Sequence, residues 1–362
     1  MQRKSQYLAS PFLSPEFAVA VGMFRSSARV AVLADGPQLA GFFPFEKRKL
    51  GVGVPIGAGL TDFQGLVHAP GADWEPRQLL RACGISVWQF DHLLSGQRPF
   101  EPYQSTLVPS PVMDLSGGFD VYREKLRVRS HSFYRTMAYK ARKLGRDRGE
   151  VRFVLDAPDT VALRRLMAWK SDQYRRTGRI DRFSQPWVVD LVDYLLNVRG
   201  GGFSSVLSFL YAGDEPVAGH LGLRFDRVLT GWFPAYDKNF HSYSPGLLHH
   251  LRLAESAAEA GIHRIDMGKG AKDYKETLKS WDLFVAEGTV AGRSPLAGAH
   301  RSRSTFAHWA FREIRNRPKL FAAADRILCT YGRARSSLRS APRPSRPAAR
   351  DEQRHGSQAG RT

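Results

Sequence analysis

The chain has 362 residues, of which 43% are hydrophobic, enough for two folded units with cores of their own. Its two cysteines, Cys83 and Cys329, lie far apart without metal-ligand spacing, which argues against a disulfide framework, a zinc site or any other metal site, and a thiol nucleophile. The net charge of +20 first suggests nucleic-acid binding, but residues 291–362 hold 16 Lys and Arg against four Asp and Glu. Nucleic acid is therefore not an expected partner of the folded body.

A strand-turn-strand pattern in the first third of the chain is repeated later. Residues 30–45 can be laid over residues 207–223, since each has a strand, a polar Gly turn and a second strand that begins Ala-Gly. This repeat predicts two units of similar architecture, and Phe42 stands in the first where the second has His220. The glycine-rich residues 51–59 are not followed by a clear helix, which favours a loop lining the cleft between the units over a dinucleotide loop.

Prolines and a glycine between residues 99 and 117 indicate a joint between the two units. Two helices are predicted after it, over residues 119–129 and 132–148. Residues 119–150 hold 10 Lys and Arg against four Asp and Glu. A solvated helix face is the ordinary interpretation of such a segment, and binding of a substrate phosphate or an anionic glycan is the alternative.

Residues 217–261 predict a hairpin followed by a helix. Apolar and aromatic runs over 217–225 and 228–236 flank Asp226-Arg227, and the helix is expected to begin at Ser244 as N-cap and to end at Gly261. The N–H groups of the three residues after Pro245 would then be free to bind a pyrophosphate, which the helix dipole also favours. An ordinary capped helix is the alternative.

The C-terminal segment divides into two parts. Apolar residues recur at helical spacing between residues 304 and 331, which predicts amphipathic helices that either pack on the preceding unit or lie on a membrane or partner. Residues 332–362 are rich in Arg, Ser, Pro and Ala and are predicted to be a disordered basic tail. No run of eighteen apolar residues occurs, so a cytoplasmic location is expected, with peripheral contact at the inner face of the membrane as a further possibility.

Several motifs are spread over residues 120–290 of the second unit. They are Lys170-Ser-Asp-Gln-Tyr-Arg-Arg-Thr-Gly178, Ala218-Gly-His-Leu-Gly-Leu223, Trp232-Phe-Pro-Ala-Tyr-Asp237, Tyr243-Ser-Pro-Gly-Leu-Leu248, and Asp266-Met-Gly-Lys-Gly270 with Tyr274-Lys275. In their order and spacing these motifs resemble the GNAT acyltransferase superfamily, and within it the CelD/BcsL type, whose members are often tied by name to cellulose and exopolysaccharide production. The family binds acetyl-CoA or another acyl-CoA with its pyrophosphate at the start of the predicted helix. The chain departs from the usual loop in having Ser244 and Pro245 in place of an early glycine.

The resemblance implies roles for particular side chains. Acyl transfer from a thioester to an amine needs a base, a polarised carbonyl and an acid for the leaving thiolate. His220 is the candidate base, Tyr274 the candidate acid and Asp237 a second choice, while backbone N–H groups over 232–235 would polarise the carbonyl. The predicted cofactor-binding residues are Phe233, Pro234, Ala235, Tyr236, Ser244, Gly246, Leu247 and Leu248. The predicted substrate-binding residues are Lys170, Gln173, Tyr174, Asp266 and Lys275.

The sequence thus predicts an α/β fold of tandem GNAT-like units, with a mixed central sheet flanked by helices. The expected division is a degenerate N-terminal domain over 1–115, a catalytic domain over 116–290, a basic amphipathic extension over 291–331 and a tail over 332–362. The expected activity is acyl-CoA-dependent N-acylation of an amine such as an amino sugar or another exopolysaccharide or envelope precursor. The alternatives are a Fem-type aminoacyl transferase that uses aminoacyl-tRNA, and a non-catalytic docking protein of a polysaccharide synthase.

Overall fold

A computed structural model describes residues 1–293 except residues 6, 157 and 271. The amphipathic extension and the tail predicted for 291–331 and 332–362 therefore lie outside the described residues, apart from residues 291–293. No helix in the described part of the chain is long and apolar enough to cross a membrane.

The part of the chain up to Asp114, the end of β6, is called the first half, and most of its regular structure is strand. Its elements are η1 (Gln2–Lys4), η2 (Pro11–Leu13), α1 (Pro15–Phe24), β1 (Ala28–Asp35), β2 (Gln38–Lys47), η3 (Lys49–Gly51), β3 (Val52–Pro55), β4 (Val67–His68), α2 (Pro76–Ala82), β5 (Val87–Leu94), η4 (Arg98–Tyr103) and β6 (Gln104–Asp114).

The second half begins with the two predicted basic helices. Its elements are α3 (Phe119–Arg129), α4 (His131–Arg148), β7 (Val151–Val154), α5 (Thr160–Arg176), η5 (Arg182–Ser184), α6 (Pro186–Leu196), β8 (Arg199–Gly200), β9 (Phe203–Ala212), β10 (Glu215–Phe225), β11 (Val228–Tyr236), η6 (Lys238–Tyr243), α7 (Pro245–Glu259), β12 (Arg264–Asp266), α8 (Asp273–Leu278) and β13 (Trp281–Ala291). The predicted hairpin is β10–β11, and the predicted helix after it is α7.

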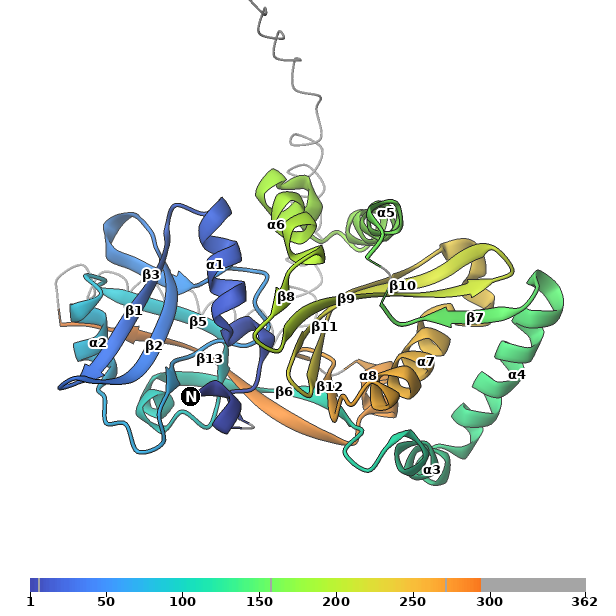
Figure 1. Cartoon of the computed structure of the whole chain (residues 1–362), viewed down its shortest axis with the longest axis horizontal. Coiled ribbons are helices and arrows are strands. Elements are labelled where there is room, and N and C mark those ends of the chain that lie inside the picture. The colour runs from blue at the N-terminus through green and yellow to red at the C-terminus, as the bar shows by residue number, and fades with distance from the viewer. Residues whose placement is uncertain (6, 157, 271, 294–362) are drawn as a thin grey trace, which may run out of the picture.

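One mixed sheet runs through both halves in the order β1-β2-β3-β5-β13-β6-β12-β11-β10-β9-β7, with β4 on β2 and β8 on β9 (Figure 1). The two halves repeat one pattern. Strands β1, β2 and β3 are successively antiparallel and β3 is parallel to β5, just as β9, β10 and β11 are antiparallel and β11 is parallel to β12. The predicted tandem architecture is thereby confirmed.

The strands that follow each repeat are exchanged between the halves. Strand β6 comes after β5 in the chain but pairs with β12, whereas β13 comes after β12 but pairs with β5, and β6 and β13 also pair with each other. Of the prolines that predict a joint, Pro99 and Pro102 lie in η4, whereas Pro109 and Pro111 belong to the central strand β6. Pro109 and Pro111 fit there because their carbonyls accept hydrogen bonds from Gly270 and Met267, and a proline lacks only the donor.

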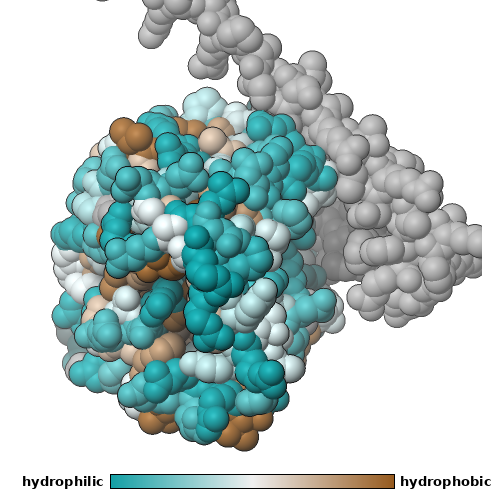
Figure 2. Space-filling model, turned by 90° about the vertical axis from the view of Figure 1, so that its right-hand side faces the viewer, coloured by the Kyte–Doolittle hydropathy of each residue, from teal (hydrophilic) through white to brown (hydrophobic). Residues whose placement is uncertain are grey.

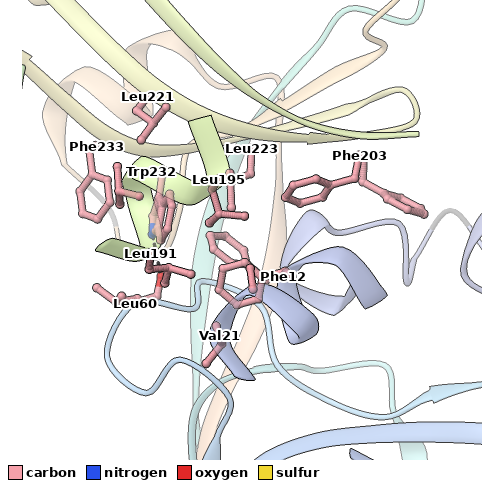
Figure 3. Close-up of a cluster of buried hydrophobic side chains, with 14 of the residues drawn as sticks. Phe12, Val21, Leu60, Leu191, Leu195, Phe203, Leu221, Leu223, Trp232 and Phe233 are labelled. Carbon is pink, nitrogen blue, oxygen red and sulfur yellow. Dashed lines mark hydrogen bonds between the residues drawn. The ribbon is translucent and has the colours of Figure 1, made fainter. Parts of the chain in front are cut away.

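The largest apolar cluster joins the N-terminal segment to the second half (Figure 3). The indole of Trp232 on β11 meets the ring of Phe12 at 5.7 Å between centroids and that of Phe17 at 6.2 Å. Its Nε1 donates to the carbonyl of Leu60 at 2.8 Å. Loop residues 56–66 of the first half are thus fixed against β11.

The end of the molecule where α4 lies is largely hydrophilic (Figures 1 and 2). The predicted basic helix over 132–148 corresponds closely to α4, which buries only Met137 and Leu144 and keeps most of its basic side chains outside the core. Lys140 is different, because its Nζ donates to the hydroxyl of Ser244 at the start of α7, at 2.7 Å.

Candidate active site

Strand β11 separates from β12 after Thr230. The two strands pair in parallel only over Val228–Thr230 and Arg264–Asp266. Opposite this point the pairing of β10 with β11 shifts register between Leu221 and Gly222, so Trp232 is an extra residue that bends β11. Beyond the bend, no strand of the described chain covers the β11 edge that faces away from β10. Backbone groups on this edge are therefore not paired with another strand of the described chain.

A lysine ammonium lies on each side of the split between β11 and β12. Lys170 of α5 donates from Nζ to the Pro234 carbonyl at 2.9 Å, and Lys275 of α8 donates to the carbonyls of Gly268 at 2.7 Å and Lys269 at 3.2 Å. Burial and neighbouring cations lower the pKa of Lys170 to about 8, and burial does the same for Lys275. Two of the predicted substrate-binding residues are thus brought together at the split.

A carboxylate from the first half reaches the same place. Asp62 follows the loop that Trp232 holds, and its Oδ2 lies 3.3 Å from the point where a Cβ on Gly268 would stand. Its Oδ1 is 3.9 Å from Nε2 of His92, and burial raises its pKa. The loop predicted over residues 51–59 is in part strand β3 (Val52–Pro55), and Asp62 lies three residues beyond its predicted end. The pattern of the sequence did not indicate Asp62 itself.

His220 lies on β10 beneath the split. It is 1% exposed, and neither ring nitrogen has a hydrogen-bond partner among the described residues. A Cβ at Gly231 would stand 3.4 Å from its Nε2, and one at Gly222 would stand 2.6 Å from its Cε1. The two glycines therefore make room for the imidazole, and Nε2 approaches the residue at which β11 leaves β12. Burial lowers the pKa of His220 well below its usual value, so the ring is neutral.

Two further histidines, on α7, link His220 to Tyr274. The His249 ring lies 5.9 Å from that of His220, the His250 ring 6.1 Å from that of His249, and Tyr274 stacks on His250 at 5.6 Å with an interplanar angle of 17°. Burial lowers the pKa of His249 to about 3 and that of His250 to about 4, and it raises the pKa of Tyr274. The predicted base and acid thus lie at two ends of a row of neutral rings. Sequence reasoning missed both helix histidines, whose adjacent position on a predicted helix was the one available signal.

The start of α7 differs from the prediction in two respects. Ser244 has φ of 53° and ψ of 51°, a left-handed conformation from which its side chain makes no cap. Instead its carbonyl accepts from the N–H groups of Leu247 at 3.0 Å and Leu248 at 3.2 Å, so these predicted free donors are engaged. Of the three N–H groups predicted to be free, only that of Gly246 has no acceptor among the described residues. Lys140 compensates, because it brings a positive charge to the same helix end.

The remaining predicted residues lie around this centre. Gln173 and Tyr174 share a face of α5 with Lys170, whose Nζ lies 5.3 Å from the centroid of the Tyr174 ring. Burial raises the pKa of Tyr174 to about 12. Phe233, Ala235 and Tyr236 belong to the uncovered half of β11, and the Tyr236 ring would contact a Cβ on Gly246 at 3.4 Å.

Asp237 does not lie with His220. Its Oδ1 accepts from the N–H of Asn239 at 2.9 Å and so caps η6. Its backbone N–H donates to the carbonyl of Val217, at the start of β10. The side chain faces a polar cavity of about 650 Å³ whose lining includes Arg148 and Asp214. This placement gives it a structural task away from the row of histidines.

Asp266 is 0% exposed, with Arg264 Nε 3.4 Å from its carboxylate, and burial raises its pKa to about 6. The folded protein therefore holds this proton to a higher pH than the unfolded chain, and the contribution of Asp266 to stability is expected to decline as the pH rises from about 4 to about 6. The buried neutral histidines act in the opposite direction over this range. Asp266→Asn should therefore shift the urea midpoint at pH 7, relative to that at pH 4.5, upward from the parent's difference. Asp237→Asn, which changes a cap outside the core, should keep the parent's difference, and an unaltered difference in Asp266→Asn would refute this assignment.

Comparison with known proteins agrees with this geometry. Residues 131–276 match the model of the acetyltransferase (GNAT) domain family. A comparison with curated proteins found no match. Among solved structures, the C-terminal domain (DUF2156) of an Agrobacterium fabrum protein provisionally named lysylphosphatidylglycerol synthetase has a TM-score of 0.52 at 12% identity, covering 79% of this chain and 90% of that one.

Two other solved structures are similar over comparable lengths. FemX has a TM-score of 0.50 at 12% identity and covers 76% of this chain and 90% of its own. A conserved protein of unknown function from Bacteroides thetaiotaomicron has a TM-score of 0.50 at 9% identity, covering 79% and 90%. At these identities the likeness concerns the fold alone. Residues 131–276 are thus similar to a GNAT acetyltransferase domain, and they lie within a tandem α/β fold.

Proposed function

We propose that the chain is an acyl-CoA-dependent N-acyltransferase that takes acetyl-CoA as donor and an amine as acceptor. The observation that supports this most directly is the split between β11 and β12, which leaves peptide groups of β11 uncovered beside the start of α7. A pantetheine amide can pair with such an edge as a strand does. The pyrophosphate would meet the Gly246 N–H and the Lys140 ammonium, since helix starts and lysines both favour anions.

The side chains at the split supply the proton transfers. As the amine nitrogen attacks the thioester carbonyl, a C–N bond forms, the C–S bond breaks, and the ammonium proton passes to His220, whose imidazole is neutral. The Tyr274 hydroxyl stays protonated because burial raises its pKa, and it would give its proton to the thiolate. Lys170 and Lys275 hold the two sides of the split in place through backbone carbonyls.

The acceptor and the subfamily rest on sequence motifs. We propose an amino sugar or another exopolysaccharide or envelope precursor, in keeping with the CelD/BcsL-like motifs from Lys170 to Lys275. A cytoplasmic location is part of this proposal. Contact of residues 291–362 with an anionic membrane or a polysaccharide synthase is a further part of the proposal. Their 16 basic residues against four acidic ones support it.

The proposed donor site can be tested at Gly246. We expect Gly246→Glu to abolish acetyl-CoA binding in calorimetry, because the side chain must pass the Tyr236 ring and places a negative charge where the pyrophosphate would lie. Gly246→Ala is the matched control: its Cβ would touch Tyr236 at 3.4 Å, an ordinary contact, and it should bind nearly as the parent does. Equal affinity of the Glu variant and the parent would place the cofactor elsewhere.

Aminoacyl transfer from aminoacyl-tRNA is the second candidate. The observation that favours it is the basic segment over 119–150, with 10 Lys and Arg against four Asp and Glu, from which Lys140 reaches the start of α7. Titration of the full chain with acetyl-CoA and, separately, with charged tRNA distinguishes the two donors. Binding of neither would favour the non-catalytic docking protein.

A further inference from the structure

Asp62 lies at the split between β11 and β12 with four cationic side chains near it. Lys170 and Arg179 come from α5 and the turn after it, and Lys272 and Lys275 from α8 and the residue before it. Lys170 and Lys275 interact with the charge of Asp62, and both are repelled by Lys272 and Arg179. The carboxylates of Asp91 and Asp266 also interact with that of Asp62. We call the four cations the cation cluster.

The cation cluster has no internal counter-charge within hydrogen-bonding range. None of its four members forms an ion pair at 4.0 Å or less with another described residue, whereas nearby Lys269 and Lys279 are both paired with carboxylates. Burial and mutual repulsion lower the pKa of Lys170, and repulsion from Arg179 adds to the effect of burial on Lys272. Like charges held together at such a cost are relieved when an anion binds.

The opposite charges lie close together. The point where a Cβ on Gly268 would stand is 3.3 Å from Oδ2 of Asp62 and 3.9 Å from Nζ of Lys275. Gly268 has φ of 79° and no side chain, so no side chain of its own comes between the carboxylate and the ammonium. A ligand with an ammonium and an anionic group separated by a few bonds matches this spacing.

We infer that the acceptor of the proposed acyl transfer is a compact zwitterion, an amine that also carries a phosphate or carboxylate, with its ammonium on Asp62 and its anion on the cation cluster. The inference rests on the proposed function and narrows its acceptor class. It also gives the first half a part in acceptor recognition, because Asp62 belongs to the loop that Trp232 fixes through Leu60.

The test compares two probes that differ in one group. In calorimetry on the full chain, phosphoethanolamine should bind at least about 10-fold more tightly than ethanolamine, since one charge-assisted contact contributes about 1.4 kcal/mol or more. β-Alanine, which carries a carboxylate in place of the phosphate, should likewise bind more tightly than ethanolamine. Asp62→Asn should weaken phosphoethanolamine binding about 10-fold, and Lys272→Gln with Arg179→Gln should reduce the preference for the phosphorylated amine. Lys125→Gln, which removes one positive charge at an exposed position on α3, serves as the control for overall charge.

The outcomes separate this inference from the proposed donor. If ethanolamine binds as well as phosphoethanolamine and β-alanine, or if none of the three binds, the zwitterion inference is overturned while acetyl-CoA binding still stands as measured. If acetyl-CoA fails to bind but the charge preference and its loss in Asp62→Asn are present, the donor is wrong and the acceptor site is retained. A loss of the preference for the phosphorylated amine in Lys125→Gln as large as that in Lys272→Gln with Arg179→Gln would also overturn the inference, because it would reflect overall charge.

Discussion

His220→Ala is expected to lower kcat about 100-fold while leaving the affinity for acetyl-CoA unchanged. The imidazole is 1% exposed and neutral, and its Nε2 approaches Gly231, where β11 leaves β12. General bases contribute about 100- to 10,000-fold, and a base whose pKa is well below neutral belongs at the low end because its proton affinity is weak. Initial rates and calorimetry on the same preparation measure the two quantities.

His249→Gln is the matched control for this prediction. His249 is as buried as His220, but its Nε2 already contacts the Ser208 hydroxyl at 3.1 Å. We expect this variant to lose less than about 10-fold in kcat, because its ring lies one step farther from the split. Full activity of His220→Ala from pH 6 to pH 9 would show that the proton leaves through water or another residue.

The local elements were predictable because their signals are local. Asp226-Arg227 between two apolar runs predicts the β10–β11 turn, and Pro245 with the apolar stripe after it predicts α7. The repeat at residues 30–45 predicts the tandem architecture. These patterns depend on residues a few positions apart, so the sequence alone contains them.

Other features depend on contacts between distant segments. The prolines at 109 and 111 indicate a joint, yet these residues form a central strand because β13, about 170 residues later in the chain, pairs with it. Asp62 reaches the split from the first half, on a loop whose Leu60 carbonyl accepts from Trp232 on β11. The prediction that the Ser244 side chain caps α7 was wrong, because η6 leads directly into α7 and Ser244 has a left-handed conformation there.

The roles of the site residues remain predictions, but the structure shows where each residue lies. Lys170 and Lys275 lie at the split and His220 beneath it, with Tyr274 at the other end of the row of rings. Asp266 pairs with Thr230 where the strands separate but is fully buried, and Asp237 caps η6. These placements depend on contacts between distant segments, so motif spacing alone could not separate the residues.

Trp232→Ala is expected to reduce the free energy of unfolding by about 3–5 kcal/mol, the usual cost of removing a large buried aromatic side chain. Trp232 is 8% exposed, stacks on Phe233 with 4.6 Å between centroids and donates to the Leu60 carbonyl at 2.8 Å. Its loss opens a cavity and leaves that carbonyl unpaired. Urea unfolding measures the effect, and Trp281→Ala, at 39% exposure on β13, is the control with an expected change of about 1 kcal/mol or less.

Trp232→Phe separates the two contributions and covers the case in which Trp232→Ala does not fold. Phenylalanine keeps an aromatic ring against Phe12 but cannot donate to Leu60, so we expect a loss of about 1–3 kcal/mol. Because the same hydrogen bond fixes the loop that carries Asp62, Trp232→Phe should also weaken acceptor binding while acetyl-CoA binding is retained. If Trp232→Phe is as stable as the parent and binds the acceptor equally well, packing alone holds the loop. The link through Leu60 would then have no part in the site.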